Sequence, residues 1–535
     1  MLKILNVAEK NNAAKSIASL LSKGTCRKRE SAAPFNQIYE FEYNLFNQNC
    51  LMVMTSVSGH LLSLEFSNKY KRWDSCDPIE LFDAKIERVC PKKYQKVMLS
   101  LQREVQSCQK LIIWTDCDRE GENIGYEIIE ACSNVHNNLD VYRAKFSEIT
   151  ASSVAKSICD LKRPNRLASD AVEVRKELDL RVGAAFTRFQ TLHLTKAFPD
   201  QLTGSLISYG SCQFPTLGFV VERYKQREKF VSKPFWKVCV FDEKDNQKVE
   251  FLWDKERMFD YQVCWNFFNK LISHQSLAVQ SVIRRPKNKC RPVALNTIEL
   301  LKLASRKLNI NAKKTMTIAE NLYSEGLISY PRTETNIFTE TFDFRGIIES
   351  QTSDQNWGLF AKNILDRPNP RNGTKSDQSH PPIYPTKYTN NLKGKEKKIY
   401  DLIVRNFLAC CSEDAKGSET AVSIDVSHEK FTASGLMVFE RNYLDVYPYE
   451  RWVNKKIPEF ENGQTFSPKS IQLNKGMTQA PRLLTEADLI DLMEKHGIGT
   501  DSTLAEHIET IKKRSYVRIE RNLFVPTVLG LGLVE

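Results

Sequence analysis

The sequence predicts a multidomain protein that joins an α/β unit to separate helical and β-rich units. Three observations lead to this fold class. The chain has 535 residues, enough for roughly three or four domains with hydrophobic cores of their own. Apolar strand patterns alternate with helical patterns over residues 1–155, as they do in α/β units. Strand-like alternation near residue 240 returns near residue 430, which indicates one β-rich domain interrupted by an insertion.

The first unit contains three strand candidates. Lys3–Val7 is the first, and an amphipathic helical pattern follows it at residues 11–23. Residues 52–57 form the second. The third is the short apolar run 111–114, after which acidic residues and Gly121 predict a loop.

The later segments alternate between helical, β and loop patterns. In order, they are helical at 156–225, β at 230–290, helical and basic at 294–325, a Pro-, Asn- and Lys-rich loop at 366–395, β at 420–447 and helical at 485–512. The predicted domains are an α/β domain at 1–155, a helical domain at 156–225 plus 478–535, a β-rich arch at 226–290 plus 411–477 and an inserted domain at 291–410. The two connections of an interrupted domain can act as hinges that let the insertion swing.

The composition excludes several classes of protein. Hydrophobic residues make up 41% of the chain, and the longest apolar runs are far shorter than the ~18 residues of a membrane span. The N-terminus lacks the apolar core of a signal peptide. Fourteen cysteines without a Cys-x-x-Cys pair argue against structural zinc and against a disulfide framework. The cysteines fit a reducing compartment, either cytosol or nucleus.

The net charge of +12 is concentrated in residues 281–314. This basic segment has a single acidic residue, Glu299, against ten basic ones: Arg284, Arg285, Lys287, Lys289, Arg291, Lys302, Arg306, Lys307, Lys313 and Lys314. A charged run is often only a solvated face. Its position directly before the motif of Tyr330 favours binding to a polyanion.

The most informative motif is KLIIWTDCDREGE, residues 110–122, in which an apolar strand ends in three carboxylates. Two unit charges about 4 Å apart repel by roughly 4 kcal/mol at an effective dielectric near 20. A divalent cation would offset the repulsion among Asp116, Asp118 and Glu120, and oxygen ligands alone favour Mg²⁺ over zinc. A solvated acidic turn is one alternative. A calcium loop is another, because these acids, Gly121 and Glu127 nearly match the EF-hand spacing, but it requires a helix where the apolar strand lies.

The motif GLISYPRTET, residues 326–335, offers a candidate nucleophile, Tyr330. Pro331 favours an extended backbone at Tyr330, and residues i and i+2 of an extended segment share a face, so Arg332 is expected beside the phenol. A tyrosine with a pKa of about 10 is a weak nucleophile at neutral pH. A nearby guanidinium favours the phenolate and can also hold a phosphate oxygen. Taken alone, the motif favours a tyrosine packed in a turn beside a surface arginine over a catalytic nucleophile.

Together, TDCDREGE and YPRTET resemble motifs of the type IA DNA topoisomerases, specifically the eukaryotic topoisomerase III group. The resemblance extends over the whole chain, in family order, through VAEK (7–10), SVSGHL (56–61), RAKFSEIT (143–150), DLRVGAAFTR (179–188), SYGSCQFPTLGFVVERY (208–224), SHPPIYPT (379–386) and HGIGTDSTLAEHI (496–508). It implies a Toprim fold for the first domain and a torus of four domains. It also implies relaxation of negative supercoils and resolution of DNA junctions.

The resemblance implies a mechanism without ATP, and no GxxxxGK[ST] motif is found. Tyr330 would attack a phosphate of single-stranded DNA, forming a 5′-phosphotyrosine and a free 3′-hydroxyl. Glu9 is the candidate proton donor to the leaving oxygen and a shared metal ligand. Lys10 and Arg332 would stabilise charge on the phosphoryl oxygens. Mg²⁺ would be held by Asp116, Asp118, Glu120 and Glu9.

The same resemblance assigns contacts to DNA. His380 matches a phosphate-contacting histidine, although a satisfied loop histidine is the alternative. Arg181, Arg188 and Gln213 match positions that line the single-strand groove; Asp179 could instead pair with Arg181. Three aromatic residues could stack on bases, although core packing is favoured for the last two: Tyr209, Phe214 and Phe219.

Partners and location follow from the resemblance alone: single-stranded DNA, a RecQ-family helicase, an OB-fold accessory protein and the nucleus. Family members usually continue beyond PTVLGLGLVE, so this chain is expected to lack the C-terminal end of the fourth domain. That departure leaves open a truncated, non-catalytic subunit of a helicase complex that binds single-stranded DNA or acts as a scaffold. A Toprim primase or nuclease is a further alternative, which would use the acids but not Tyr330.

Overall fold

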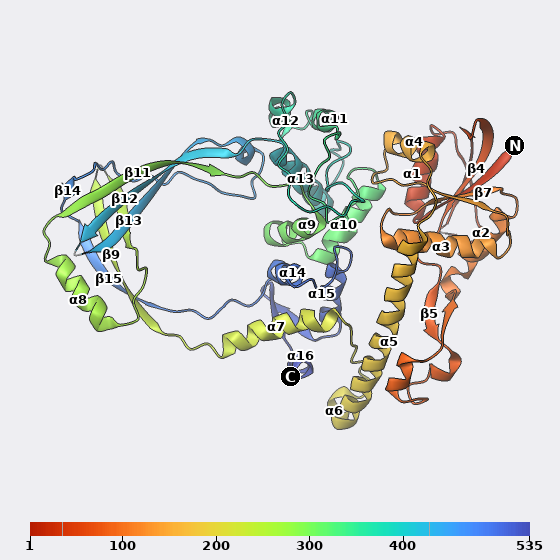
Figure 1. The fold of residues 1–535 in the computed structure, drawn as a ribbon, viewed down its shortest axis with the longest axis horizontal. Coiled ribbons are helices and arrows are strands. Elements are labelled where there is room, and N and C mark those ends of the chain that lie inside the picture. Colours follow the sequence, from red (N-terminus) through yellow and green to blue (C-terminus); the bar gives the residue numbers. More distant parts are fainter. Residues whose placement is uncertain (35, 245, 427) are drawn as a thin grey trace.

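The structure is a computed structural model that describes residues 1–34, 36–244, 246–426 and 428–535. In Figure 1 the ribbon follows a closed ring. The N-terminal α/β unit lies at one end, the β-rich unit at the other, and two groups of helices lie between them. No helix within the described ranges is long and apolar enough to cross a membrane.

The described part of the α/β unit has a six-stranded sheet with the order β2-β3-β4-β1-β7-β8. Its strands are β1 (Leu2–Ala8), β2 (Arg27–Arg29), β3 (Ile38–Leu45), β4 (Gln48–Ser56), β7 (Lys110–Trp114) and β8 (Asp140–Arg143). Strand β1 runs parallel to both β4 and β7, so the residues after β1 and β7 meet at one edge of the sheet. The strands predicted at Lys3–Val7, 52–57 and 111–114 are confirmed.

Helices cover both faces of this sheet. They are α1 (Asn11–Leu21) and α4 (Ala151–Cys159) on one face, and α2 (Gln95–Val105) and α3 (Arg119–Ser133) on the other. The helix predicted at 11–23 is confirmed. A hairpin that was not predicted from the sequence joins β5 (Ser63–Phe66) and β6 (Ile86–Val89), with short 3-10 helices at Asn68–Tyr70 and Pro78–Phe82.

The first helical group begins with α5, Arg166–Ala197, the long helix seen in Figure 1. The group's other elements are α6 (Pro199–Leu202), α7 (Gln213–Glu228), α14 (Glu486–Lys495), α15 (Leu504–Lys513), β16 (Val517–Glu520), β17 (Leu523–Pro526) and α16 (Val528–Val534). Two segments far apart in sequence therefore share one core, in which Leu217 and Val221 pack with Leu489 and Ile508.

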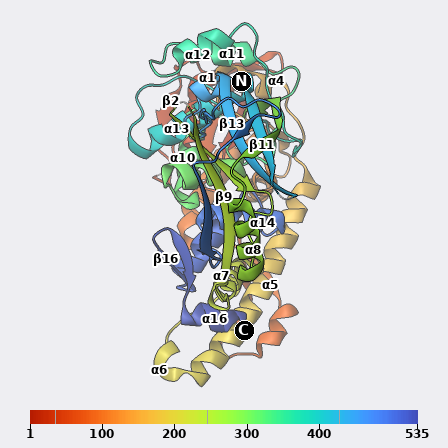
Figure 2. The same ribbon diagram turned by 90° about the vertical axis from the view of Figure 1, so that its left-hand side faces the viewer.

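The β-rich unit has a sheet with the order β14-β11-β12-β13-β10-β9-β15 in the described ranges. Its strands are β9 (Pro234–Lys244), β10 (Gln247–Trp253), β11 (Leu277–Lys289), β12 (Ala415–Val426), β13 (Glu429–Glu440), β14 (Thr465–Phe466) and β15 (Ser470–Met477). The expectation of β structure over 230–290 is wrong at α8, Tyr261–Ile272, which Asp260 caps through the Val263 backbone N–H. Asp245 and Ser427 lie outside the described residues. Figure 2 shows these strands from the outer end of the ring.

The chain between β11 and β12 forms the second helical group, here called the inserted unit. Its helices are α9 (Thr297–Leu303), a π-helical turn at Ala304–Leu308, α10 (Ala312–Ser324), α11 (Phe344–Ser350), α12 (Gly358–Ile364) and α13 (Gly394–Cys410). Residues 366–393 form the predicted loop. One apolar core runs from α1 and β1 of the α/β unit into α10 and α13, so the inserted unit packs directly on the α/β unit.

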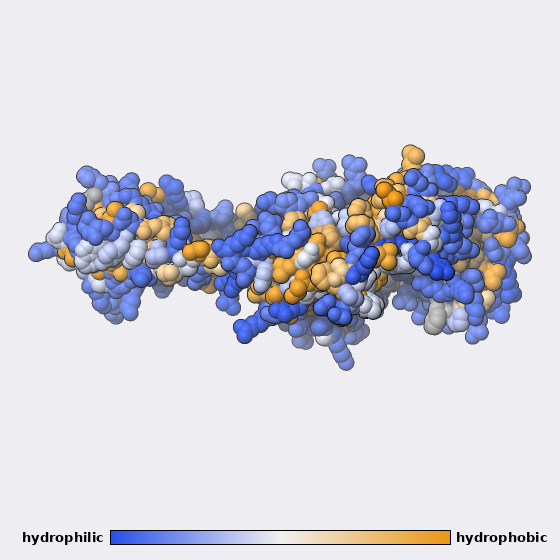
Figure 3. Space-filling model, turned by 90° about the horizontal axis from the view of Figure 1, so that it is seen from below, coloured by the Kyte–Doolittle hydropathy of each residue, from blue (hydrophilic) through white to orange (hydrophobic). Residues whose placement is uncertain are grey.

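More than half of the basic segment's charges are paired with acids in the described ranges, and most of these acids are distant in sequence. Six of its ten basic residues form ion pairs: Lys287 with Glu419, Lys289 with Glu450, Arg291 with Asp414, Lys302 with Glu299, Asp491 and Glu494, Arg306 with Asp488 and Asp491, and Lys313 with Glu506. The local excess of positive charge is therefore much smaller in the fold than in the sequence. In Figure 3 hydrophilic side chains cover most of the lower face, and hydrophobic ones gather mainly on the central body.

Candidate active site

Two acidic segments meet where strands β1 and β7 end. Glu9 follows β1, and its Oε2 accepts a hydrogen bond of 3.2 Å from the Asp116 backbone N–H. The Lys10 Nζ lies 3.5 Å from Asp116 Oδ2 and 3.8 Å from Glu9 Oε1. The parallel pairing of the strands thus brings Glu9, Lys10 and Asp116 together.

A tight turn between β7 and α3 positions the two aspartates. Asp118 caps α3, because its Oδ1 accepts a hydrogen bond of 2.7 Å from the Gly121 N–H. A Cβ on Gly121 would lie 1.9 Å from the Asp116 carbonyl oxygen, so only glycine fits there. The buried guanidinium of Arg143 donates to the same carbonyl at 2.7 Å and to Glu122 at 3.1 Å. The motif therefore encodes a turn with little freedom.

Glu120 does not join this pocket. Its carboxylate accepts from His60 Nε2 at 3.1 Å and forms an ion pair with Arg175. Burial raises the pKa of Glu120, but the hydrogen bond from His60 and the charge of Arg175 lower it overall. Glu127 is bound to the other nitrogen of His60, at 2.9 Å. The calcium-loop alternative is wrong, because a strand rather than a helix precedes Asp116.

Tyr330 reaches the pocket from the inserted unit. Its side chain is 2% exposed, and its hydroxyl donates to Asp118 Oδ2 at 2.6 Å. The backbone N–H of Tyr330 donates to the Ser147 carbonyl at 2.9 Å. The phenol ring lies between Tyr323, whose centroid is 5.3 Å away, and His380, at 4.5 Å. The candidate nucleophile and the acids are therefore in direct contact.

Arg332 does not produce a phenolate in this arrangement. Burial, followed by the charges of Asp118 and Asp116, raises the pKa of Tyr330 well above its usual value, and Arg332 lowers it only in part. The Arg332 guanidinium is held by Glu320 at 2.9 Å and by the Ser502 carbonyl at 2.6 Å. The phenol is therefore protonated, and its hydrogen points at Asp118.

The pocket carries more negative charge than its surroundings stabilise. Burial and the neighbouring Asp116 raise the pKa of Glu9 to about 8. Burial also raises the pKa of Asp116 despite the nearby Lys10. Among the described residues, no group of three or more His, Cys, Asp or Glu side chains is arranged so that it could hold a metal ion by itself. The donor set still fits Mg²⁺, which commonly takes one or two carboxylates and completes its shell with water and substrate phosphate.

His380 offers two polar atoms to a ligand. The ring is 7% exposed, and neither of its nitrogens has a hydrogen bond of good geometry among the described residues, although the Cys117 backbone lies close to the ring. Burial lowers the pKa of His380, so the ring is neutral at pH 7. A buried imidazole without partners is costly, and a ligand beside Tyr330 would satisfy it.

The three other expected DNA contacts have structural roles here. Arg181 donates to the Leu81, Phe82 and Ala84 carbonyls at 3.2, 2.9 and 2.9 Å and pairs with Glu177, while Asp179 faces Arg175. Arg188 donates to the Tyr70 and Arg72 carbonyls at 2.6 and 3.1 Å. Gln213 donates to the Ser208 carbonyl at 3.3 Å. Arg181 and Arg188 fasten the β5–β6 region to α5, and Gln213 ties the start of α7 to the segment before it. These side chains are therefore not free in this structure to contact DNA.

The aromatic residues form a packed row. Tyr209 lies 4.8 Å from Phe186 and 4.7 Å from Phe214, centroid to centroid. Phe214 and Phe219 pack against the core of the first helical group, as predicted. Phe186 is partly exposed at one end of the row, where a stacking surface remains.

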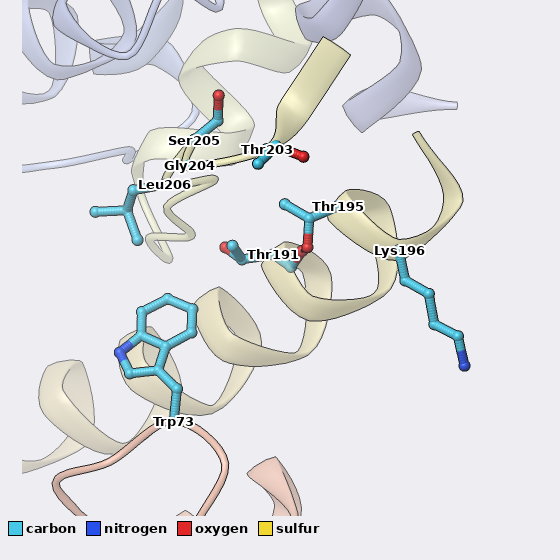
Figure 4. Close-up of a pocket in the computed structure, with 8 residues that line it drawn as sticks. All are labelled: Trp73, Thr191, Thr195, Lys196, Thr203, Gly204, Ser205 and Leu206. Carbon is cyan, nitrogen blue, oxygen red and sulfur yellow. The ribbon is translucent and has the colours of Figure 1, made fainter. Parts of the chain in front are cut away.

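A separate hollow lies at the far end of α5. Figure 4 shows Trp73 directed into it, with Thr191 and Thr195 above and Lys196 directed away. The Thr195 hydroxyl already donates to the Thr191 carbonyl at 2.6 Å. The hollow offers an aromatic surface and hydroxyl groups but no acid or base directed inward.

Two residues of the pocket, Tyr323 and Glu320, were not predicted from the sequence. The Tyr323 hydroxyl donates to Asp116 Oδ1 at 3.4 Å, and Glu320 holds Arg332. Both lie on α10, three residues apart. A spacing of three residues is typical of any helix face that packs on a core. No local sequence pattern could therefore have identified Tyr323 and Glu320 as residues of the pocket.

Two family models match most of the chain. A Toprim domain model matches residues 4–149, and a DNA topoisomerase model matches residues 163–535. The chain is 56% identical to human DNA topoisomerase 3-alpha over 100% of this chain and 54% of that protein. It is 40% identical to DNA topoisomerase 3 of Schizosaccharomyces pombe, over 100% and 88%. It thus spans about half the length of the human relative.

A solved structure shares the fold. It is that of full-length topoisomerase I from Thermotoga maritima, with a TM-score of 0.74 and 23% identity. The match covers 99% of this chain and 82% of that one. The ring-shaped architecture with a Toprim domain is therefore confirmed.

Proposed function

This chain belongs to the type IA DNA topoisomerase family, and we propose that it cuts and reseals single DNA strands through Tyr330. It would pass another strand through the break, relaxing negative supercoils and resolving DNA junctions without ATP. The observation that carries this proposal is the hydrogen bond of 2.6 Å between the Tyr330 hydroxyl and Asp118, beside the unpartnered His380.

In the proposed cleavage step, the Tyr330 oxygen forms a bond to a backbone phosphorus while the bond from phosphorus to the 3′-oxygen breaks. The phenol proton passes to Asp118, which already accepts it as a hydrogen bond. The leaving 3′-oxygen takes a proton from Glu9, which carries one at neutral pH because its pKa is raised to about 8. Resealing reverses the step, so the phosphodiester energy is conserved.

Cationic groups and His380 would stabilise the phosphate during transfer. Lys10 lies beside Asp116, and Arg332, held by Glu320, lies close enough to Tyr330 to act on its charge, so we assign both to the phosphoryl oxygens. His380 would donate a hydrogen bond from one ring nitrogen to the same phosphate. These roles explain a neutral, buried imidazole next to the nucleophile.

Mg²⁺ is proposed as the cofactor, held by Asp116 and Asp118 with Glu9 near by. When bound, it would neutralise the carboxylates and polarise the phosphate. Glu120 is not carried into this ligand set, because His60 and Arg175 engage its carboxylate.

The remaining proposals rest on similarity to the eukaryotic topoisomerases 3. They are a nuclear location, a RecQ-family helicase partner and an OB-fold accessory partner. Single-stranded DNA is the proposed nucleic-acid partner. Arg181, Arg188 and Gln213 are not carried forward as its contacts, because each is engaged by backbone carbonyls.

The test is transfer of a label to the protein. A 3′-labelled single-stranded oligonucleotide is incubated with the chain and Mg²⁺, and the mixture is quenched with detergent. We expect labelled protein, and its complete loss in Tyr330→Phe. Binding without any adduct in the unaltered chain would favour the non-catalytic subunit, and nicking that survives Tyr330→Phe would favour a nuclease.

A further inference from the structure

The inserted unit meets the α/β unit along a narrow contact between short backbone segments, here called the seam. One side is Ser147–Ile149, and the other is formed by residues 326–330 and 382–384. The Tyr330 N–H donates across the seam to the Ser147 carbonyl at 2.9 Å. This seam must part if Tyr330 is to move away from the acids.

The two sides of the seam approach very closely at Gly326. Its φ of +70° suits glycine, and a Cβ there would lie 2.6 Å from the Ile149 carbonyl oxygen. The backbones are therefore in contact with no intervening side chain. Such a seam has a single well-defined closed position.

One hydrogen bond across the seam lies apart from the reacting groups. The Tyr384 hydroxyl donates to Glu148 Oε2 at 2.7 Å. The second carboxylate oxygen of Glu148 accepts from the Thr150 hydroxyl at 2.9 Å. The carboxylate is thus oriented by its own unit toward the opposite one.

The Tyr384 ring is anchored in the inserted unit. Its centroid lies 4.8 Å from that of Phe342 and 6.0 Å from that of Phe338, and the side chain is buried. Its backbone is tied to Ser329 in both directions, at 3.0 Å each. A rigid ring, fixed next to the segment of Tyr330, therefore presents one hydroxyl to the other unit.

We propose that Tyr384 and Glu148 form a latch that positions the inserted unit on the α/β unit in the closed state. A hydrogen bond to a carboxylate is stronger than one between neutral groups, and this one is partly shielded from water by the buried Tyr384. The latch takes no part in bond making or breaking. Its role in strand passage rests on the proposed function, whereas the closed state itself is a property of the DNA-free chain.

The test measures opening without DNA. Donor and acceptor dyes are attached at Cys159, on α4, and at Cys290, where the chain enters the inserted unit; both thiols are exposed. Single-molecule energy transfer then gives the ratio of open to closed molecules. Tyr384→Phe keeps the ring and removes only the hydroxyl, and we expect the ratio to rise about tenfold.

Tyr443→Phe is the matched control. Tyr443 is also buried and donates to a carboxylate, Glu450, at 2.9 Å, but both residues lie on one side of the seam. We expect its open-to-closed ratio to stay within about twofold of the unaltered chain. Glu148→Gln, which keeps an acceptor but no charge, should fall between the two variants. Equal ratios for Tyr384→Phe and Tyr443→Phe would overturn the latch.

Adduct formation separates the latch from the chemistry. Tyr384→Phe should form the Tyr330 adduct with a single-stranded oligonucleotide within about twofold of the unaltered rate. Loss of the adduct in this variant alone would overturn the proposal, since Tyr384 would then act in the cleavage step. If the unaltered chain forms no adduct, the proposed function is wrong. The energy-transfer measurement, which uses no DNA, still tests the latch in that case.

Discussion

At the scale of single residues, burial disfavours the charged forms of the acidic groups in the pocket. Glu9 and Asp116 are both pushed toward their protonated forms, mainly by burial. Tyr330 is held protonated by the same surroundings. The phenol is therefore in place and protonated in the free chain. A bound cation would favour the ionised forms of the neighbouring carboxylates.

The raised pKa of Glu9 makes the stability of the chain depend on pH. The folded state keeps the proton up to about pH 8, whereas the unfolded state loses it near pH 4.5. The folded state therefore binds more protons between these values, and stability falls as pH rises through them. Glu9→Gln removes this penalty. We expect its melting temperature to exceed that of the unaltered chain at pH 8, with the difference shrinking toward pH 5, in scanning calorimetry without divalent cations.

A matched carboxylate checks that the effect belongs to the pocket. Glu65 is half-exposed on β5, and within the described ranges its one ion pair is with the exposed Lys71. Glu65→Gln should change the melting temperature little at either pH. A Glu9→Gln variant that is less stable than the unaltered chain at pH 8 would show that Glu9 is ionised in the fold.

At the scale of elements, the strands that carry the site were predictable and their tertiary partners were not. Strands β1 and β7 are buried on both faces and read as short apolar runs, which local periodicity detects. Helix α8 was missed because its aromatic residues also suit strands. Arg181 donates hydrogen bonds to carbonyls about a hundred residues away in the sequence. Local sequence patterns cannot predict such a contact.

The turn after β7 gives an element-scale prediction. Gly121→Ala would place a methyl group 1.9 Å from the Asp116 carbonyl oxygen, so the turn or the start of α3 must move. We expect a loss of about 2–4 kcal/mol in the free energy of unfolding, as for other severe backbone clashes. Urea denaturation followed by circular dichroism measures it.

Gly218 on α7 is the control for this change. A methyl group added there would have no neighbouring atom within 4 Å, and the backbone is that of an ordinary helix. Gly218→Ala should therefore be neutral or stabilising by up to about 1 kcal/mol, because alanine favours helix. Equal losses for the two variants would contradict the assignment of a special role to the turn.

At the scale of the whole molecule, the site exists only because the chain closes on itself. Tyr330 and Asp118 are 212 residues apart and belong to different units. Local patterns predicted each motif, but only the family resemblance predicted that they meet. The apolar core that continues from α1 into α10 and α13 also explains why the closed ring is favoured, since opening would expose part of it to water.

Ion pairing with acids elsewhere in the chain also changes what the basic segment contributes to DNA binding. Of its ten basic residues, four form no ion pair within the described ranges: Arg284, Arg285, Lys307 and Lys314. Each phosphate neutralised on a single strand adds about 0.7 to the slope of log affinity against log salt. Replacing all four by Ala should therefore reduce that slope by up to about three, measured by fluorescence anisotropy of a labelled single-stranded oligonucleotide.

Four paired residues provide the comparison for this test: Lys287, Arg291, Arg306 and Lys313. Their charges are already offset by acids, so replacing them by Ala should change the slope much less while lowering stability, because it leaves partners such as Asp414 unpaired. Equal reductions in slope for the two sets would mean that DNA displaces the acids. In that case the charge of the sequence, rather than that of the folded ring, would govern binding.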